Sequence, residues 1–306
     1  MTLSFTALTS ALQINRSDAE LLLATAARME AAIQKDGGTD LAGGKVLAAL
    51  FYEPSTRTRL SFETAMLRLG GKVISAEGVE FSSISKGETI EDTIRVVGGY
   101  ADVIAMRHPQ MGSADRAAAV SEVPFINAGD GPGQHPTQAL LDLYTIQKER
   151  GGIEGVHIAM VGDLKFGRTV HSLTQLLSLF PSVRFTFVSP AALPMPEKVT
   201  NLLREKGIAY IETTDLKEGL QADVLYMTRV QKERFADAAE YERLKLAYIL
   251  TADLLQGKQC TVMHPLPRVG EITEDVDALP AAAFFREAHN GVPMRMALIA
   301  HLLRLV

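Results

Sequence analysis

Short runs of apolar and β-branched residues alternate with longer helical patterns along most of the chain. This alternation is typical of α/β proteins, because each parallel strand needs a crossover helix before the next one. The pattern therefore predicts an α/β fold with two open parallel sheets, each flanked by helices. The strand candidates are 46–52, 72–75, 103–106, 124–127, 156–162, 184–188, 208–212, 224–227 and 261–263.

A turn-rich stretch, NAGDGPGQHP at 127–136, interrupts the alternation and leads into an apolar helix. A chain of 306 residues is long enough for two domains with separate cores. We therefore expect one domain over residues 1–131 and another over 132–289. The last segment, from about 290 to 306, reads as a packing helix, and its residues alone do not say which domain receives it.

Composition excludes several classes of protein. The formal net charge of −5 and the absence of a basic stripe argue against a nucleic-acid surface. One cysteine, Cys260, cannot form an internal disulfide or a multi-thiolate metal site, and no His, Cys, Asp or Glu pair has metal-ligand spacing on a helix face. No apolar run is long enough to span a membrane, and the start does not read as a signal peptide. We expect a cytoplasmic protein without metal or membrane partner.

The segment EPSTRTR at 53–59 carries more hydroxyls and guanidiniums than a helix start requires. Neither Ser55 nor Thr56 has Glu or Gln three residues later, so a capping box does not explain the pair. A strand, a tight turn and a helix N-terminus present backbone N–H groups and a positive dipole end, which suit an anion. Arg57 and Thr58 could add further donors, and phosphate is the favoured ligand. The alternative is an ordinary capped helix whose arginines lie in solvent.

Other cationic residues follow strand candidates directly. Arg107 follows 103–106, Arg168 begins a helix after 156–162, and Arg229 with Gln231 follows 224–227. Ligands of open α/β sheets gather outside the carboxyl ends of strands, so these positions favour anion binding. The segment 161–172 lacks GxGxxG, and the chain lacks GxxxxGK[ST], so neither dinucleotide nor nucleotide binding is predicted.

The segment GQHPTQ at 133–138 opens the helix of the domain boundary. Pro136 suits the first helical position, and Gln138 could reach back as a cap. His135 is a mediocre N-cap, so a donor role toward a polarised oxygen is the sharper alternative.

The segment MHPLPR at 263–268 ends another strand candidate. Pro265 and Pro267 remove N–H donors and stiffen the backbone, which leaves the carbonyls of Pro265 and Leu266 as acceptors. His264 alone is expected to be structural.

Two capping boxes can be read from the sequence. Ser17 with Glu20 would cap a helix near the start of the chain, and Ser85 with Glu88 would cap a second one. Lys86 would then lie in the first turn of that second helix, where the helix dipole disfavours a cation. A structural preference does not explain Lys86, which indicates a functional role.

Seven motifs together resemble the aspartate/ornithine carbamoyltransferase family, and within it the aspartate carbamoyltransferase catalytic chains. The resemblance covers about residues 48–306, with the motifs in the family's order. They are STRTR (55–59), SKGET (85–89), MRHPQ (106–110), HPTQ (135–138), GDLKFGRTVHS (162–172), MTRVQKER (227–234) and HPLPR (264–268).

The resemblance implies that the carbamoyl group of carbamoyl phosphate is transferred to the amine of L-aspartate, giving N-carbamoyl-L-aspartate and phosphate in an early step of pyrimidine synthesis. It implies no cofactor and a homotrimer with shared active sites, and leaves room for regulatory or other pathway subunits. The first domain would bind carbamoyl phosphate and receive the helix at about 290–306, and the second would bind aspartate.

The resemblance also implies roles for individual residues. The carbamoyl phosphate site would comprise Ser55, Thr56, Arg57, Thr58, Arg107, His135, Gln138, Pro265, Leu266 and Pro267. The aspartate site would comprise Arg168, Arg229, Gln231 and Leu266, with Ser82 and Lys86 from a neighbouring subunit. The catalytic residues would be Arg57, Thr58, Lys86, Arg107 and His135. A cis peptide bond is implied between Leu266 and Pro267.

Two alternatives stay open from the sequence. An ornithine carbamoyltransferase would share the first half of the reaction, but ornithine needs a carboxylate partner where this chain offers Arg229 and Gln231, and HPLP differs from the HCLP-type element. A catalytically silent scaffold subunit would be expected to have lost some of the cationic residues, and none is lost. No side chain is an obvious general base, so the acceptor of the amine proton is left open, and the departing phosphate could take it.

Overall fold

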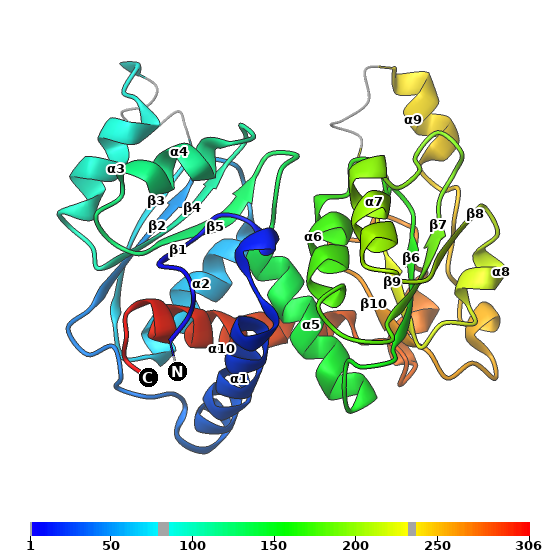
Figure 1. The fold of residues 1–306 in the computed structure, drawn as a ribbon, viewed down its shortest axis with the longest axis horizontal. Coiled ribbons are helices and arrows are strands. Elements are labelled where there is room, and N and C mark those ends of the chain that lie inside the picture. Colours follow the sequence, from blue (N-terminus) through cyan, green and yellow to red (C-terminus); the bar gives the residue numbers. More distant parts are fainter. Residues whose placement is uncertain (1, 79–85, 232–236) are drawn as a thin grey trace. The chain divides into compact units, whose positions relative to one another are not determined.

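The computed structural model describes residues 2–78, 86–231 and 237–306 (Figure 1). They form two parallel sheets of five strands each, with helices packed on the sheets. The predicted α/β fold with two open parallel sheets is therefore confirmed. Contacts divide the chain into two compact units, Met1–Tyr144 with Asn290–Val306, and Thr145–His289.

The first sheet has the strand order β1-β5-β4-β2-β3, and every neighbouring pair is parallel. Its strands are β1 (Ala7–Leu8), β2 (Val46–Phe51), β3 (Lys72–Glu77), β4 (Val103–His108) and β5 (Phe125–Asp130). The sequence did not predict β1, because two residues are too short for a visible strand pattern. It pairs with β5 at the edge of the sheet.

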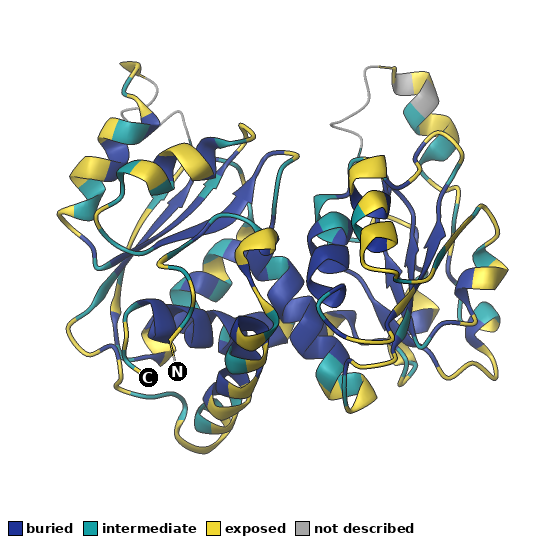
Figure 2. Cartoon of the chain, in the orientation of Figure 1, coloured by how far each residue is buried: buried dark blue, intermediate teal, exposed yellow. Residues whose placement is uncertain are grey.

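Helices cover both faces of the first sheet (Figure 1). On one face, α3 and α4 pack their apolar residues against Leu50, Ile104 and Met106. The central strands are buried, as Figure 2 shows. The helices of this unit are α1 (Arg16–Asp36), α2 (Thr56–Arg68), α3 (Ile90–Gly98), α4 (Ser113–Val120), the first part of α5 (Pro136–Arg150) and the last part of α10 (Phe284–Leu302), with the 3-10 helix Ala11–Gln13.

The second sheet has the strand order β10-β9-β6-β7-β8 and is again parallel throughout. Its strands are β6 (His157–Val161), β7 (Arg184–Val188), β8 (Tyr210–Thr213), β9 (Val224–Met227) and β10 (Thr261–Met263). Buried Leu225, Val262 and Phe284 belong to the core of this unit. Its other helices are α6 (Arg168–Leu177), α7 (Glu197–Glu205), α8 (Leu216–Gly219) and α9 (Ala238–Leu244), with 3-10 helices at Asp253–Leu255 and Glu274–Ala278.

The division between the units falls inside α5, between Tyr144 and Thr145, and inside α10, between His289 and Asn290. The expected boundary at 131/132 lies before the start of α5. Residues 290–306 pack with the first unit. The ligands assigned to the two domains remain predictions.

Both predicted capping boxes are wrong. Helix α1 begins at Arg16, and its N-cap is Asn15, whose side chain accepts from the Asp18 N–H at 2.9 Å while the Asp18 carboxylate accepts from the Asn15 N–H at 3.3 Å. Asparagine caps a helix as well as serine does, so the cap falls two residues before Ser17.

Helix α3 begins at Ile90 and is capped by Thr89, which accepts from the Asp92 N–H at 3.1 Å. Glu88 accepts a hydrogen bond from the Thr93 hydroxyl instead. Lys86 therefore lies before the helix rather than in its first turn, and Ser85 lies outside the described residues.

Three further observations concern membrane spans, metal sites and the single cysteine, which were considered from the sequence. Within the described residues, no helix combines the length and the apolar character needed to cross a bilayer. In that same part of the chain, no three His, Cys, Asp or Glu side chains cluster as metal ligands would. Cys260 is buried, and burial raises the pKa of its thiol.

The cap of α1 gives a stability prediction. Asn15→Ala removes the acceptor for the Asp18 N–H and should lower the free energy of unfolding by about 1 kcal/mol. The matched control is Ser17→Ala, because Ser17 is exposed inside the helix and its replacement should change that free energy by less than about 0.5 kcal/mol. Urea-induced unfolding, followed by circular dichroism, measures the free energy of unfolding of both variants. Equal losses in both variants would contradict this position of the cap.

Candidate active site

The start of α2 has the geometry of an anion site. Strand β2 is buried, and the chain turns directly after it so that α2 begins at Thr56 with Ser55 as its N-cap. The Ser55 side chain makes no capping bond, and no acidic residue lies in the first turn. The first N–H groups of a helix have no acceptor within the helix. Backbone donors, the hydroxyl of the buried Thr58 and the exposed Arg57 are thus gathered at one helix end.

Neighbouring strands bring further predicted residues to the same edge of the first sheet. Strand β4 pairs with β2, with Phe51 opposite Arg107, so Arg107 lies at the strand end beside the start of α2. Strand β5 pairs with β4 on the other side and leads through a short loop to His135 and α5. The parallel order β5-β4-β2 therefore collects three predicted segments at one edge.

Arg107 is held in place by an ion pair. Its Nη2 lies 2.9 Å from Glu53 Oε2, and only 11% of the Arg107 side chain is exposed. Its Nη1 lies 3.5 Å from the carbonyl oxygen of Ala128 in β5. Glu53 was not predicted as a partner, although it lies in the same EPSTRTR segment. An anionic ligand that approaches Arg107 competes with this carboxylate for the guanidinium.

His135 and Gln138 lie at the start of α5. His135 is 4% exposed and precedes Pro136, the first helical residue. The Gln138 Nε2 donates to Asp142 Oδ1 at 2.8 Å, one turn further on, and the expected reach of the Gln138 side chain back to the helix start stays a prediction. Asp142 is fully buried and is the acceptor for this amide N–H₂ group.

The loop before α5 is organised by Asp130, which the sequence did not single out. Asp130 is 6% exposed and accepts from the N–H groups of Gly112 at 3.0 Å and Gln134 at 2.6 Å. A Cβ at Gly133 would lie 2.6 Å from Asp130 Oδ1, so only glycine fits against this carboxylate. The signal in the sequence is an aspartate placed between glycines, GDGPG at 129–133.

The second unit repeats this arrangement with other residues. Strands β6 and β9 are paired neighbours. Arg168 begins α6 after β6, whereas Arg229 and Gln231 follow β9, and all three side chains are half-buried. Two guanidiniums at neighbouring strand ends suit a dicarboxylic ligand, because each can bind a carboxylate with paired hydrogen bonds.

Asp163 connects these two loops and was also missed. It is fully buried and accepts from the N–H groups of Phe166 at 2.9 Å and Gln231 at 3.4 Å. The Gln231 side chain donates to the carbonyl of Phe166 at 2.9 Å. Burial raises the pKa of Asp163 despite these hydrogen bonds and the positive charge of Arg229. An aspartate after a strand has no apolar pattern, so its burial could not be read from the sequence.

The HPLPR segment follows β10, which pairs with β9. The peptide bond between Leu266 and Pro267 is cis, and Leu266 has a φ of 55°. The Leu266 N–H donates to Nδ1 of His264 at 2.7 Å. His264 is thus a structural residue, as expected, and it holds the turn whose carbonyls were predicted as acceptors.

Lys86 is exposed and precedes α3. Ser82, the other residue expected from a neighbouring subunit, lies outside the described residues. The remaining predicted residues fall into two clusters, each at the carboxyl edge of its own sheet. The first cluster is Ser55, Thr56, Arg57, Thr58, Arg107, His135 and Gln138, and the second is Arg168, Arg229, Gln231, Pro265, Leu266 and Pro267.

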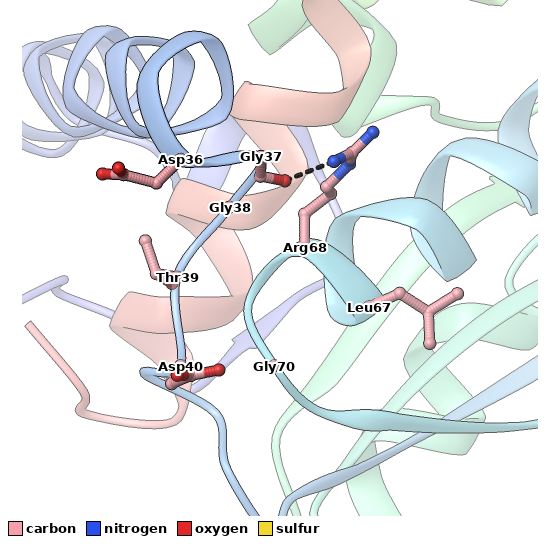
Figure 3. Close-up of a pocket in the computed structure, with 8 residues that line it drawn as sticks. All are labelled: Asp36, Gly37, Gly38, Thr39, Asp40, Leu67, Arg68 and Gly70. Atoms are coloured by element: carbon pink, nitrogen blue, oxygen red, sulfur yellow. Dashed lines mark hydrogen bonds between the residues drawn. The ribbon is translucent and has the colours of Figure 1, made fainter.

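A surface cleft of about 510 Å³ lies elsewhere in the first unit, between the ends of α1 and α2 (Figure 3). Arg68 donates to the carbonyl of Gly37 at its rim. None of the predicted ligand-binding residues lines it. Its lining residues are Asp36, Gly37, Gly38, Thr39, Asp40, Leu67, Arg68 and Gly70.

Comparison with known proteins identifies the family. Residues 7–148 match the aspartate/ornithine carbamoyltransferase carbamoyl-P binding domain, and residues 154–302 match the Asp/Orn binding domain of the same family. The chain belongs to the aspartate/ornithine carbamoyltransferase family. The resemblance drawn from the seven motifs is confirmed, and the chain is a transferase.

Individual relatives are similar over nearly the full length. The aspartate carbamoyltransferase catalytic subunit of Methanocaldococcus jannaschii is 52% identical over 92% of each chain, and that of Leptospira biflexa is 51% identical over 94% of this chain and 93% of its own. A solved structure of the M. jannaschii subunit has a TM-score of 0.92 over 98% of each chain at 50% identity. The Trypanosoma cruzi enzyme, solved with carbamoyl phosphate and aspartate, has a TM-score of 0.91 at 43% identity over 97% of this chain and 96% of its own.

Asp163 gives a prediction for the second cluster. In Asp163→Asn a single amide oxygen replaces two acceptors, so either Phe166 or Gln231 loses the partner of its N–H. The loops that carry Arg168 and Arg229 should loosen, and binding of succinate, a dicarboxylate without an amine, should weaken about tenfold. Calorimetric titration with succinate, in the presence of phosphate, measures this affinity. Asp253→Asn, at an exposed aspartate of the same unit, is the control, and equal affinities in all three proteins would refute this role.

Proposed function

We infer that this chain transfers the carbamoyl group of carbamoyl phosphate to the amine of L-aspartate, giving N-carbamoyl-L-aspartate and phosphate. The observation that carries this inference is its identity of about 50% with aspartate carbamoyltransferase catalytic subunits over more than nine-tenths of the chain. Structures of the T. cruzi enzyme, which is 43% identical, contain carbamoyl phosphate with aspartate, or carbamoyl aspartate with phosphate. We further propose that the reaction serves pyrimidine synthesis in the cytoplasm.

The first cluster supports a carbamoyl phosphate site. A phosphate placed at the start of α2 accepts backbone N–H groups and meets the positive end of the helix dipole. Ser55, Thr56, Arg57 and Thr58 then add side-chain donors from the same turn. Bonds to a charged ligand contribute about 1.5–3 kcal/mol each, so this helix end is well suited to a doubly charged phosphate.

Catalysis in this proposal depends on the carbonyl oxygen of the carbamoyl group. Attack by the amine converts it into an oxyanion, and the donors directed to it are the Thr58 hydroxyl, the Arg107 guanidinium and the His135 ring. Arg107 and His135 are both largely buried, which strengthens their electrostatic effect. Preorganised donors of this kind contribute a factor of about one hundred to one thousand each.

The amino group of carbamoyl phosphate needs acceptors rather than donors. Because Gln138 Nε2 donates to Asp142, its Oε1 is the atom that can accept from this amino group. The carbonyls of Pro265 and Leu266, in the turn that contains Pro267, are the other proposed partners. Three oxygens directed at one amino group would distinguish a carbamoyl group from an acetyl group.

The second cluster supports binding of aspartate. Arg168 and Arg229 would bind its two carboxylates, with Gln231 and the Leu266 carbonyl as additional partners. Lys86 and Ser82 of a neighbouring subunit would complete the site. No described side chain near either cluster is placed as an obvious base, so we assign the amine proton to the departing phosphate.

Ornithine is the competing acceptor, because the same family contains ornithine carbamoyltransferases. The purified chain should form citrulline from ornithine at least a thousandfold more slowly than carbamoyl aspartate from aspartate, since a buried polar mismatch rejects substrates by factors of about 10⁴. A colorimetric ureido assay with each acceptor and carbamoyl phosphate measures both rates. Turnover of ornithine without turnover of aspartate would refute the proposed acceptor.

The shared site of a homotrimer gives a second prediction. Chains with Lys86→Ala and chains with Arg57→Ala should each be almost inactive alone. Mixed trimers contain one site with both residues intact, so mixing should restore about one third of the wild-type activity per mixed trimer. The control mixes Arg57→Ala with Arg107→Ala, whose residues belong to the same unit of one chain and cannot complement. Equal activity in both mixtures would contradict a Lys86 that acts on a neighbour.

A further inference from the structure

The turn after β10 rests on a buried pair of side chains, His264 and Glu271. His264 is 1% exposed and Glu271 is 4% exposed, and His264 Nε2 lies 2.6 Å from Glu271 Oε1. On the other side of the ring, Nδ1 lies 2.7 Å from the Leu266 nitrogen. The second carboxylate oxygen of Glu271 accepts from the Val269 N–H at 2.9 Å. The imidazole thus connects the peptide at Leu266 to a buried carboxylate.

These contacts determine the tautomer of His264. A backbone N–H can only donate, so Nδ1 must accept from Leu266 and carries no proton. The ring proton therefore lies on Nε2 and is donated to Glu271 Oε1. Burial raises the pKa of the Glu271 carboxyl, but the contact with His264 and the hydrogen bond from Val269 outweigh burial and lower this pKa. The backbone N–H of His264 also has a partner, because it donates to Glu287 Oε2 at 2.8 Å.

The hydrogen bond from the Leu266 N–H to His264 also stabilises the unusual backbone conformation of Leu266. Leu266 has a φ of 55°, a left-handed conformation that costs a non-glycine residue about 1–2 kcal/mol. A hydrogen bond from its N–H to a fixed acceptor offsets that cost and keeps the N–H inside the turn. Since Pro265 and Pro267 have no N–H, the turn then presents carbonyl oxygens and no backbone donor.

We propose that His264, oriented by Glu271, is a positioning residue that directs the carbonyls of Pro265 and Leu266 toward the amino group of carbamoyl phosphate. This inference rests on the proposed function. The turn would bind a carbamoyl group, because the carbamoyl nitrogen carries two N–H donors for these carbonyls. It would not bind inorganic phosphate, which offers no N–H donor. His264 itself contacts no substrate and acts only through the turn.

A carboxylate at position 271 is required in this arrangement. Glu271 accepts on both oxygens, from His264 and from Val269. Glutamine has one acceptor and one donor group, so it would set an N–H against the Val269 N–H or against the protonated Nε2 of His264. In the second case the ring changes tautomer, and its Nδ1–H then faces the Leu266 N–H. Glu271→Gln should therefore disturb the turn without a change in side-chain size.

The test compares two ligands that differ in the carbamoyl group. In His264→Leu the Leu266 N–H loses its acceptor, and affinity for carbamoyl phosphate should fall about tenfold, whereas affinity for inorganic phosphate should not change. His264→Asn is the matched control, because its Oδ1 can accept from the Leu266 N–H as in an Asx turn, and it should stay within about threefold of wild type. Calorimetric titration of the full-length chain measures both ligands.

Glu271→Gln provides a second route should His264→Leu fail to fold, and it should show the same selective loss for carbamoyl phosphate. Its KM for carbamoyl phosphate should rise more than its kcat falls. Equal weakening of both ligands, or no weakening of either, would overturn the role of His264 and Glu271. A wild-type chain that forms no carbamoyl aspartate would instead remove the proposed function, so the two failures can be told apart.

Discussion

Parallel pairing is the constraint on which both clusters depend. In a parallel sheet all strands end at the same edge, so segments far apart in the sequence meet there. In the first unit the order β5-β4-β2 brings the loop before His135, the residue Arg107 and the start of α2 to one edge. In the second unit the order β10-β9-β6 does the same for the HPLPR turn, Arg229 and Arg168. For this reason the residues proposed to bind anions can be far apart along the chain and still lie at one sheet edge.

Buried carboxylates have a separate task from the cations. Asp130, Asp163 and Glu271 each accept backbone N–H groups of the loops that follow the strands. A carboxylate has two oxygens and can therefore hold two separate peptides, which an amide or a hydroxyl cannot do as well. These carboxylates hold loops, whereas the guanidiniums of the two clusters are the groups proposed to bind ligands. A chain with a formal charge of −5 can thus bind two anionic substrates.

The fold could be predicted because the apolar strand patterns are strong and regular. Strands at 184–188, 224–227 and 261–263 were placed to the residue, since each is buried on both faces and bounded by polar loops. Strand β1 has two residues and no pattern of its own, so it was missed. The caps of α1 and α3 were misplaced because several Ser, Thr, Asn and Asp residues compete near each helix start, and only tertiary contacts select among them. Asp18, for example, also accepts from the Ser4 N–H at 2.9 Å.

The candidate site could be predicted only in part, for a physical reason. Residues such as Arg57 and Arg107 are unusual at strand and helix ends, and their charge makes them visible in the sequence. Residues that hold the loops, such as Asp163 and Glu271, look like ordinary polar loop residues until their burial is known. His264 was expected to be structural, but its tautomer and its acceptor role follow only from the positions of Leu266 and Glu271.

The same division of charge would let the second unit, as the proposed aspartate site, discriminate between acceptor amino acids. Asp163 already receives hydrogen bonds from Phe166 and Gln231, and it is fully buried, so it offers no carboxylate to a ligand ammonium group. An ornithine side chain placed beside Arg168 and Arg229 would meet two like charges, and like charges at contact distance cost several kcal/mol where water is excluded. The β-carboxylate of aspartate would meet the same guanidiniums with a favourable sign. Selectivity then arises as much from repulsion of the wrong side chain as from binding of the right one.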